Sequence, residues 1–312
     1  MDTIQIAAVS AINLLVGFGL SKLYQCKRSQ PTSNNIKSSV KNLYSKVVTN
    51  KKPFKFGFSC CGDNQSSNPS NEIKELYGNI MCDSYECVDG YMKEADHGLG
   101  CGIPTQFADI KKGDIVLDLG SGAGVDCFVA REITGSEGKV IGLDFTEEMI
   151  KKAQSNSDNK GYRNVEFRQG DIEDMPIIDN YVDVIISNCV INLCPDKKQA
   201  YKEIFRVLKQ GGHFSISDIV IDGHLPQKFR EVAEVISACV GGAMNINEQI
   251  QLVKDLGFDN VEIKKQKTIE VPDELVVKFI GTKGLEELKQ YNTKILSITL
   301  YAEKPQKIQR IQ

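Results

Sequence analysis

Three glycines at alternate positions form the first group of residues that could bind a small molecule. The run Val116-Leu-Asp-Leu-Gly-Ser-Gly-Ala-Gly-Val-Asp126 contains Gly120, Gly122 and Gly124, with Ser121 between the first two. Glycine is favoured where the backbone takes a positive φ or approaches a ligand closely, and the exposed N–H groups of a following helix point at the same place. This pattern therefore predicts a ligand-binding turn between a strand and a helix.

The glycine spacing and a nearby acidic residue separate the kinds of ligand that such a turn could bind. A dinucleotide fingerprint needs Gly-x-Gly-x-x-Gly, but Val125 stands where its third glycine would fall. Asp118 lies just before the glycines, where a carboxylate would repel a pyrophosphate and suit a cationic sulfonium or ammonium group. The segment resembles the first motif of class I methyltransferases that bind S-adenosylmethionine (SAM). A dinucleotide site and a purely structural turn are the alternatives.

Later strand ends supply further candidate contacts for SAM. Asp144 ends the second predicted strand, where an acidic side chain can accept hydrogen bonds from both ribose hydroxyls; a solvated strand-end carboxylate is the alternative. Asp171 and Ile172 follow the third predicted strand, in the position that would border the adenine. Asn188, next to the end of the fourth predicted strand, completes the predicted cofactor site.

Three of the ten cysteines share a position that the others lack, because each falls in a loop that the fold would place above the ligand. Cys101 lies in a glycine-rich loop before the first strand, Cys189 follows the fourth strand, and Cys239 closes a predicted amphipathic helix. The carboxyl ends of the strands converge, so the three thiols could meet above the methyl donor. Converging thiolates select soft, thiophilic centres, so these cysteines are candidate ligands for such an atom.

Other cysteines allow less specific interpretations. Cys60 and Cys61 are adjacent, and are either two surface thiols on a loop or a mobile redox or metal-delivery pair. Cys127, on the first predicted helix, is best explained as a small buried hydrophobe. The three histidines are scattered and the cysteines lack paired Cys-x-x-Cys spacing, which argues against a zinc site. A βαβ domain does not need disulfides, so we expect the thiols to serve chemistry in a reducing cytosol.

Alternating strands and helices must position these residues. Five strands are predicted, each followed by helical spacing or a turn, and two more follow near the C-terminus. The predicted strands cover residues 115–119, 139–144, 164–169, 182–187, 213–218, 261–267 and 295–303. The predicted helices after the first cover residues 146–155, 195–208, 226–238 and 248–256. This order predicts an α/β fold of the class I methyltransferase (Rossmann-like) type, with a mostly parallel sheet, helices on both faces and a cysteine-bearing flap.

The length of 312 residues suits one large domain with extensions. We divide it into an N-terminal hydrophobic segment and basic linker (1–39), a cysteine-rich lead-in (40–112), a SAM-binding core (113–222), and a substrate-binding flap with C-terminal strands (223–312). The net charge is −3, although nine Lys or Arg and no Asp or Glu occur between Thr3 and Gly62. The remainder is therefore acidic, which argues against nucleic acid as a partner of the main domain.

Residues 4–20 carry no charged side chain and are followed by Lys22, Lys27 and Arg28. As a helix this segment would span roughly 25 Å, a little short of a hydrocarbon core of about 30 Å. The positive charges would keep the following chain on the cytoplasmic side of a membrane. We expect a cytoplasmic catalytic domain, and the segment is a membrane anchor, a targeting peptide or a simple hydrophobic tail.

The cysteine loops resemble those of the arsenite methyltransferase family. The similar segments are Gly98-Leu-Gly-Cys-Gly-Ile-Pro104, Ile185-Ile-Ser-Asn-Cys-Val-Ile-Asn-Leu193 and Ala238-Cys-Val-Gly-Gly-Ala243, and the resemblance runs from about residue 40 to 305. It implies an enzyme that methylates trivalent arsenic with SAM, for detoxification. It also implies arsenic bound by the thiolates of Cys101, Cys189 and Cys239.

The same resemblance implies that the Cys60 and Cys61 pair assists arsenic binding or redox turnover, with a thiol reductant of the thioredoxin or glutathione type as partner.

Two alternatives to arsenic methylation remain open. One is a SAM methyltransferase of a lipid-like quinone or sterol, which gives no reason for cysteines at all three loop positions. The other is a non-catalytic thiol-rich protein that binds arsenic or another soft metal, which gives no reason for the intact glycine motif.

Overall fold

The computed structural model describes residues 37, 41, 45, 83–227 and 238–306. Contacts divide the chain into Met1–Ser38 and Ser39–Gln312, and the described elements belong to the second unit. Residues 4–20, Cys60, Cys61 and most of the predicted flap helix lie outside the described residues, so the expectations for them stay predictions. Within the described ranges, none of the helices combines the length and apolar character needed to cross a membrane.

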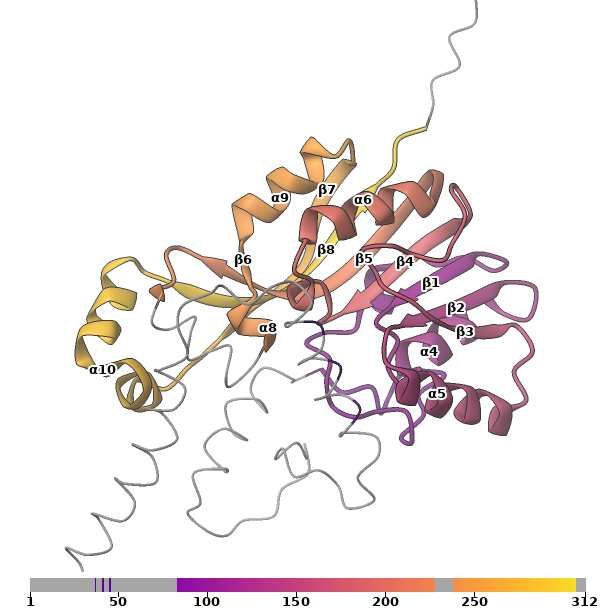
Figure 1. The fold of residues 1–312 in the computed structure, drawn as a ribbon, viewed down its shortest axis with the longest axis horizontal. Coiled ribbons are helices and arrows are strands. Elements are labelled where there is room, and N and C mark those ends of the chain that lie inside the picture. The colour runs from indigo at the N-terminus through magenta and orange to yellow at the C-terminus, as the bar shows by residue number, and fades with distance from the viewer. Residues whose placement is uncertain (1–36, 38–40, 42–44, 46–82, 228–237, 307–312) are drawn as a thin grey trace, which may run out of the picture. The chain divides into compact units, whose positions relative to one another are not determined.

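One sheet of eight strands organises the described residues (Figure 1). The strands are β1 (Ile115–Leu119), β2 (Lys139–Asp144), β3 (Val165–Gln169), β4 (Val182–Asn188), β5 (Leu208–Asp222), β6 (Met244–Asn245), β7 (Asp259–Ile269) and β8 (Lys294–Glu303). The main path has the order β3-β2-β1-β4-β5-β8-β7, and β6 pairs with β5. Neighbouring strands are parallel except for β8, which is antiparallel to β5 and β7. The predicted, mostly parallel sheet is confirmed.

Helices cover both faces of this sheet. The described helices are η1 (Pro104–Phe107), α4 (Val125–Thr134), α5 (Glu147–Lys160), η2 (Ile191–Leu193), α6 (Lys197–Val207), α8 (Ala238–Gly241), α9 (Ile246–Asp255) and α10 (Asp273–Gln290). In Figure 1, α4 and α5 lie on one side and α6 and α9 on the other. Successive strand residues alternate between these layers, because Val116 shares a core cluster with Phe128 of α4 and Leu117 shares one with Tyr201 of α6.

Several element boundaries differ from the sequence prediction. β5 begins at Leu208, five residues before the predicted strand, and its pairing with β4 contains a register shift. α5 continues to Lys160 and ends at Gly161, whose φ is 68°. Thr146, where the predicted helix begins, is the N-cap residue of α5, and its side chain makes no capping hydrogen bond. α10 has no counterpart in the prediction, since two glycines weaken its helical pattern and Gly281 kinks it.

A buried lysine fixes the end of β8 against the α6–β5 connection. The ammonium group of Lys304 donates to the carbonyl oxygens of Phe205 and Leu208, each at 2.7 Å, and to Asn180 Oδ1 at 2.8 Å. Its side chain is almost completely buried. Three acceptors therefore compensate the burial of one positive charge.

We expect Lys304→Met to lower the free energy of unfolding by about 2 kcal/mol, because two buried carbonyl groups would lose a charged donor. Urea denaturation followed by circular dichroism measures the change. Lys294→Met is the matched control, since Lys294 is exposed at the opposite end of β8 and should shift stability by less than about 0.5 kcal/mol. Equal effects of the two substitutions would contradict this assignment.

Candidate active site

The loop between β1 and α4 has the conformation that its glycines predict. Gly120, Gly122 and Gly124 have φ values of 68°, 52° and 99°, in the left-handed region that favours glycine. The N–H of Gly120 donates to the Leu143 carbonyl at 2.7 Å, which ties the loop to β2. A Cβ atom on Gly120 would lie 2.5 Å from Cγ2 of Val190, so a larger residue would clash there.

Asp144 at the end of β2 holds the same loop. Its carboxylate accepts hydrogen bonds from the Gly122 N–H at 3.0 Å and from the Thr146 N–H at 2.8 Å. The residue is 7% exposed, and this burial raises its pKa while the two backbone donors lower it. A carboxylate has about four acceptor positions, so Asp144 keeps capacity for further donors such as ribose hydroxyls.

The hydroxyl of Ser121 supports a polar ligand at this loop. It is buried and has no hydrogen-bond partner among the residues that the structure describes. A buried polar group without a partner costs free energy, so a ligand that bonds to it would be stabilised there. The glycine loop, Asp144 and Ser121 together fit the nucleoside part of SAM.

Asp171 and Ile172 follow β3 near Asp144. The Gly170 N–H donates to the Asp144 carbonyl oxygen at 3.0 Å, which keeps the two strand ends together. The Asp171 carboxylate accepts from the Glu173 N–H at 2.9 Å in a tight turn, and Ile172 packs into the main core cluster. Their contact with adenine stays a prediction, and their position beside β2 is compatible with it.

Asp118 makes a contact that the sequence does not predict. The carboxylate is fully buried and accepts a hydrogen bond from the Cys127 thiol at 3.2 Å. Burial raises the pKa of Asp118, and the nearby Asp126 carboxylate raises it further. The predicted burial of Cys127 is confirmed, and its thiol also satisfies Asp118.

Cys101 and Cys189 meet although 88 residues separate them. A disulfide joins them, with Cα atoms 5.8 Å apart, and their exposures are only 4% and 5%. Cys189 has φ 58°, which is uncommon for a residue with a side chain, and its N–H donates to the Ser217 carbonyl of β5 at 2.8 Å. Sequence analysis predicts free thiols at these two positions. The structure corrects this prediction, because the separation of the two Cα atoms is that of a disulfide.

The third predicted cysteine lies on a nearby element. Cys239 belongs to α8, which packs against η2, the short helix that follows Cys189, and against β5. The described structure does not include the Cys239 side chain or any part of Cys60 and Cys61. A site of three thiolates therefore stays a prediction, with two of its members in contact.

Asn188 fixes the loop that carries Cys101. Its Oδ1 accepts from the Cys101 N–H at 2.9 Å, and its Nδ2 donates to the Gly102 carbonyl at 2.7 Å. A Cβ atom on Gly100 would lie 2.5 Å from Nδ2, so glycine at this position permits the close approach. Sequence analysis predicts Asn188 as a cofactor contact. Its described hydrogen bonds go instead to the cysteine loop and to the side chains of Tyr85 and Asp126.

Tyr85 and Asp126 connect this amide to the helix of the glycine loop. The Tyr85 hydroxyl donates to Asp126 Oδ1 at 2.8 Å and accepts from Asn188 Nδ2 at 2.8 Å. Burial raises the pKa of Tyr85 well above its usual value, so the phenol keeps its proton. Burial also raises the pKa of Asp126 to about 6, although the bonds from Tyr85 and Asn188 lower it. Sequence reasoning missed Tyr85 because the contact spans 103 residues and leaves no local pattern.

Asp218 is a third side chain at the cysteine pair that sequence analysis missed. One oxygen of its carboxylate and the sulfur atoms of Cys101 and Cys189 all lie within 4.8 Å of one another. The carboxylate accepts from the backbone N–H of Asn192 at 3.1 Å and from its amide at 2.8 Å, so it holds η2 against β5. Burial raises the pKa of Asp218 to about 7, against the lowering effect of its backbone donors.

Comparisons with known proteins agree with this geometry. A family model described as a methyltransferase domain matches residues 110–266, and the fold is that of class I SAM-dependent methyltransferases. The chain is 38% identical over 247 residues to an arsenite methyltransferase of Halobacterium salinarum, covering 79% of this chain and 59% of that protein. It is 34% identical over 250 residues to an arsenite methyltransferase of Aquipseudomonas alcaligenes, covering 78% and 68%.

A solved structure is also similar. The crystal structure of an arsenic(III) SAM methyltransferase from Chlamydomonas reinhardtii is 32% identical, with a TM-score of 0.58 and 74% of each chain covered. This chain belongs to the arsenite methyltransferase family. It spans 59% of the length of the Halobacterium protein, so the matched region leaves part of that protein without a counterpart.

We expect Asn188→Asp to displace the Cys101 loop, because an oxygen would replace the donor that faces the Gly102 carbonyl and the Asp126 carboxylate. Such uncompensated buried acceptors cost about 1–3 kcal/mol. The measurement is the fraction of Cys101–Cys189 crosslink after mild oxidation, read by peptide mass spectrometry. The crosslinked fraction should fall in Asn188→Asp and stay unchanged in Asn247→Asp, an exposed control. Full crosslinking in Asn188→Asp would refute the positioning role.

Proposed function

We propose that this chain transfers a methyl group from SAM to trivalent arsenic bound by cysteine thiolates, and so detoxifies arsenic. The observation that carries the proposal is the place of the cysteine pair. Cys189 joins Cys101 at the end of β4, and Val190, the next residue, packs directly over Gly120 of the glycine loop. A thiophilic atom held by these sulfurs would therefore lie beside the loop that is suited to the methyl donor.

Trivalent arsenic suits this site because thiolates prefer soft centres. Reduction of the Cys101–Cys189 disulfide would provide two sulfur ligands. Cys239 is proposed as the third ligand, since α8 packs against the short helix that follows Cys189. Thiols have a pKa near 8.5, so arsenic binding must favour the thiolates and release their protons.

The donor site is proposed to use the residues of the two strand ends. Asp144 would hold the ribose hydroxyls and Ser121 would give its unpartnered hydroxyl to the ligand. We retain the other predicted contacts as part of this proposal; they are Asp118, Gly120, Gly122, Gly124, Asp171, Ile172 and Asn188. Burial and Asp126 raise the pKa of Asp118, and a nearby sulfonium would favour its ionised form, whereas a phosphate group would disfavour it further.

When bound, SAM supplies an electrophilic methyl group on its sulfonium. Arsenic held by three sulfurs is pyramidal and keeps a lone pair, which forms the new bond to the methyl carbon. Transfer would break the carbon–sulfur bond of the donor, and the electrons of that bond would stay on the donor sulfur. The arsenic becomes pentavalent, and two thiols restore the trivalent state as they join in a disulfide.

Residues of this chain contribute positioning to that transfer. The Cys101 N–H donates to Asn188 Oδ1 at 2.9 Å, and the Cys189 N–H donates to the Ser217 carbonyl at 2.8 Å. These two hydrogen bonds fix the backbone of both cysteines. Holding two reactants in near-attack geometry can lower a barrier by roughly 7–11 kcal/mol. No general base on arsenic is needed, because the attacking lone pair carries no proton.

We expect the purified chain to form methylated arsenic from arsenite when SAM and a thiol reductant are present. Chromatography with elemental detection separates the products. Cys189→Ser should abolish them while SAM affinity, measured by calorimetry, stays unchanged, because Ser cannot replace a thiolate ligand. Loss of SAM affinity in this variant would instead identify Cys189 as a structural residue.

Cys194→Ala is the matched control for that substitution. Cys194 lies a few residues further along the chain and is buried, and burial raises the pKa of its thiol to about 12. The Cys194 thiol points to the Val190 carbonyl oxygen, at 3.9 Å, and is not grouped with the sulfur atoms of Cys101 and Cys189, so this variant should keep its activity.

SAM binding without arsenite binding would favour a different methyl acceptor, and binding of both without product would favour a non-catalytic binding protein.

A further inference from the structure

Two consecutive residues after β4 reach toward opposite neighbouring strands. β4 lies between β1 and β5 in the strand order. The sulfur of Cys189 lies within 4.8 Å of a carboxylate oxygen of Asp218, which belongs to β5. Val190, the next residue, packs instead over Gly120 at the end of β1. Val190 therefore lies between the cysteine pair and the glycine loop.

The contact between Val190 and the glycine loop is close. A Cβ atom on Gly120 would lie 2.5 Å from Cγ2, 2.7 Å from Cγ1 and 3.1 Å from Cβ of Val190. Both methyl groups of Val190 thus face the backbone of Gly120, whose φ of 68° belongs to the turn of the glycine loop. The side chain is half-buried, so part of its apolar surface stays open. Val190 therefore forms one wall of the space at the glycine loop.

Hydrogen bonds within and beside η2 fix the position of this wall. The Val190 carbonyl accepts from the Leu193 N–H at 2.9 Å, at the start of η2. The side-chain amide and the N–H of Asn192 donate to the Asp218 carboxylate at 2.8 Å and 3.1 Å, which ties η2 to β5. A β-branched side chain is also restricted at χ1. Both the backbone and the methyl groups of Val190 therefore have little freedom to move.

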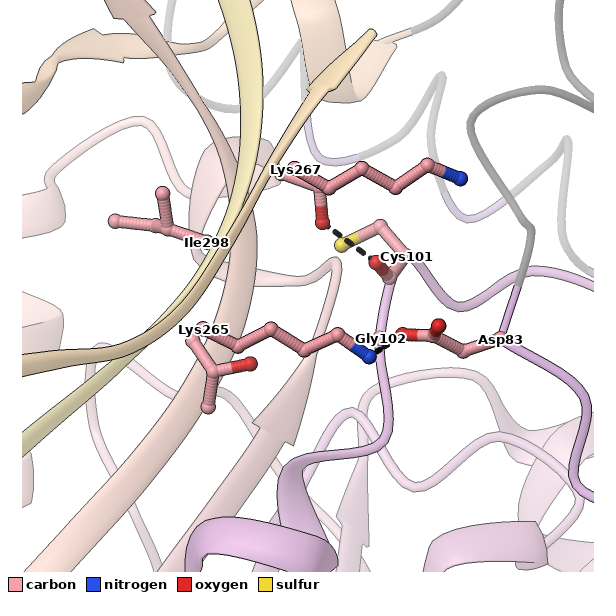
Figure 2. A pocket seen from close by; sticks show the side chains of 8 residues that line it. Asp83, Cys101, Gly102, Lys265, Lys267 and Ile298 are labelled. Carbon is pink, nitrogen blue, oxygen red and sulfur yellow. Dashed lines mark hydrogen bonds and ion pairs between the residues drawn. The ribbon is translucent and has the colours of Figure 1, made fainter.

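The opposite side of the cysteine pair carries charged and hydroxyl side chains. A small pocket beside Cys101 lies there (Figure 2), and its lining residues are Asp83, Cys101, Gly102, Lys265, Lys267, Ser297, Ile298 and Thr299. Lys265 forms an ion pair with Asp83 at 2.7 Å, and Figure 2 shows these two side chains facing each other. Ser297 Oγ donates to the Cys101 carbonyl oxygen at 2.6 Å. The wall toward the glycine loop differs, because Val190 presents methyl groups without a hydrogen-bonding or nucleophilic atom.

We propose that Val190 is a positioning residue that sets the separation between the methyl donor and the cysteine-bound acceptor. The inference rests on the proposed function, in which SAM occupies the glycine loop and arsenic the thiolates. Val190 touches the loop that would hold one reactant and adjoins the cysteine that would hold the other, so its volume determines how closely they approach. Transfer needs reacting atoms about 3–3.5 Å apart, and a misplacement of about 1 Å can cost roughly a hundred-fold in rate.

The first test measures SAM binding to the full chain by calorimetry, without arsenite. Val190→Ile adds one carbon against Gly120 and should raise the dissociation constant for SAM about five-fold, because overfilling a close contact forces the loop to shift. Val261→Ile is the matched control, since Val261 is also half-buried against the main core cluster but belongs to β7 at the edge of the sheet. The control should leave the dissociation constant unchanged. Equal SAM affinities of Val190→Ile and the natural sequence would overturn the proposal.

The second test measures methylated arsenic. Val190→Ala removes both methyl groups and should lower kcat about ten-fold with an unchanged KM for SAM, because the donor still binds but loses its near-attack geometry. Val190→Thr keeps the branched shape and should recover at least half of the rate, and Val261→Ala should keep all of it. A natural kcat in Val190→Ala, or no recovery in Val190→Thr, would overturn the proposal. Absence of product from the natural sequence would refute the proposed function, and calorimetry would still decide whether Val190 borders the donor.

Discussion

The amide of Asn188 is the interaction on which the geometry of this site depends. One side chain accepts from the Cys101 N–H and donates to the Gly102 carbonyl, and it also reaches Tyr85 and Asp126. Because Asn188 directly precedes Cys189, fixing the Cys101 loop on this amide necessarily brings the two cysteines together. Asp126 belongs to the first turn of the helix that follows the glycine loop, so the same network links the glycine loop to the cysteine pair.

The C-terminal strands give the cysteines a supporting surface that the parallel core lacks. β5 holds the segment after β4 through the Ser217 carbonyl and the Asp218 carboxylate. β8 then runs antiparallel beside β5 and contributes Ser297, which binds the Cys101 carbonyl. A five-stranded core would leave that carbonyl group without this partner. The added strands thus extend the sheet and also fix the loop that precedes its first strand.

Buried carboxylates give this region its electrostatic character. Asp118, Asp126 and Asp218 are almost completely buried, and burial raises the pKa of each. Their hydrogen bonds come from neutral donors, which are the Cys127 thiol, the Tyr85 hydroxyl and the Asn192 amide. In surroundings of low polarity such groups favour positively charged ligands over anions. This agrees with a sulfonium donor at the glycine loop.

Local sequence determined the parallel strands, the glycine turn and the residues at the strand ends, because these depend on spacing of two or about four residues and on the backbone freedom of glycine. The order of predicted strands also placed Cys101 and Cys189 in loops at the ends of strands. Only the tertiary structure decided that the two are joined, that Asn188 serves the cysteine loop, and that Tyr85, Asp218 and Ser297 support it. These contacts join side chains from strands and loops distant in sequence, and their pairing is fixed by sheet order and register, which a single sequence does not encode locally.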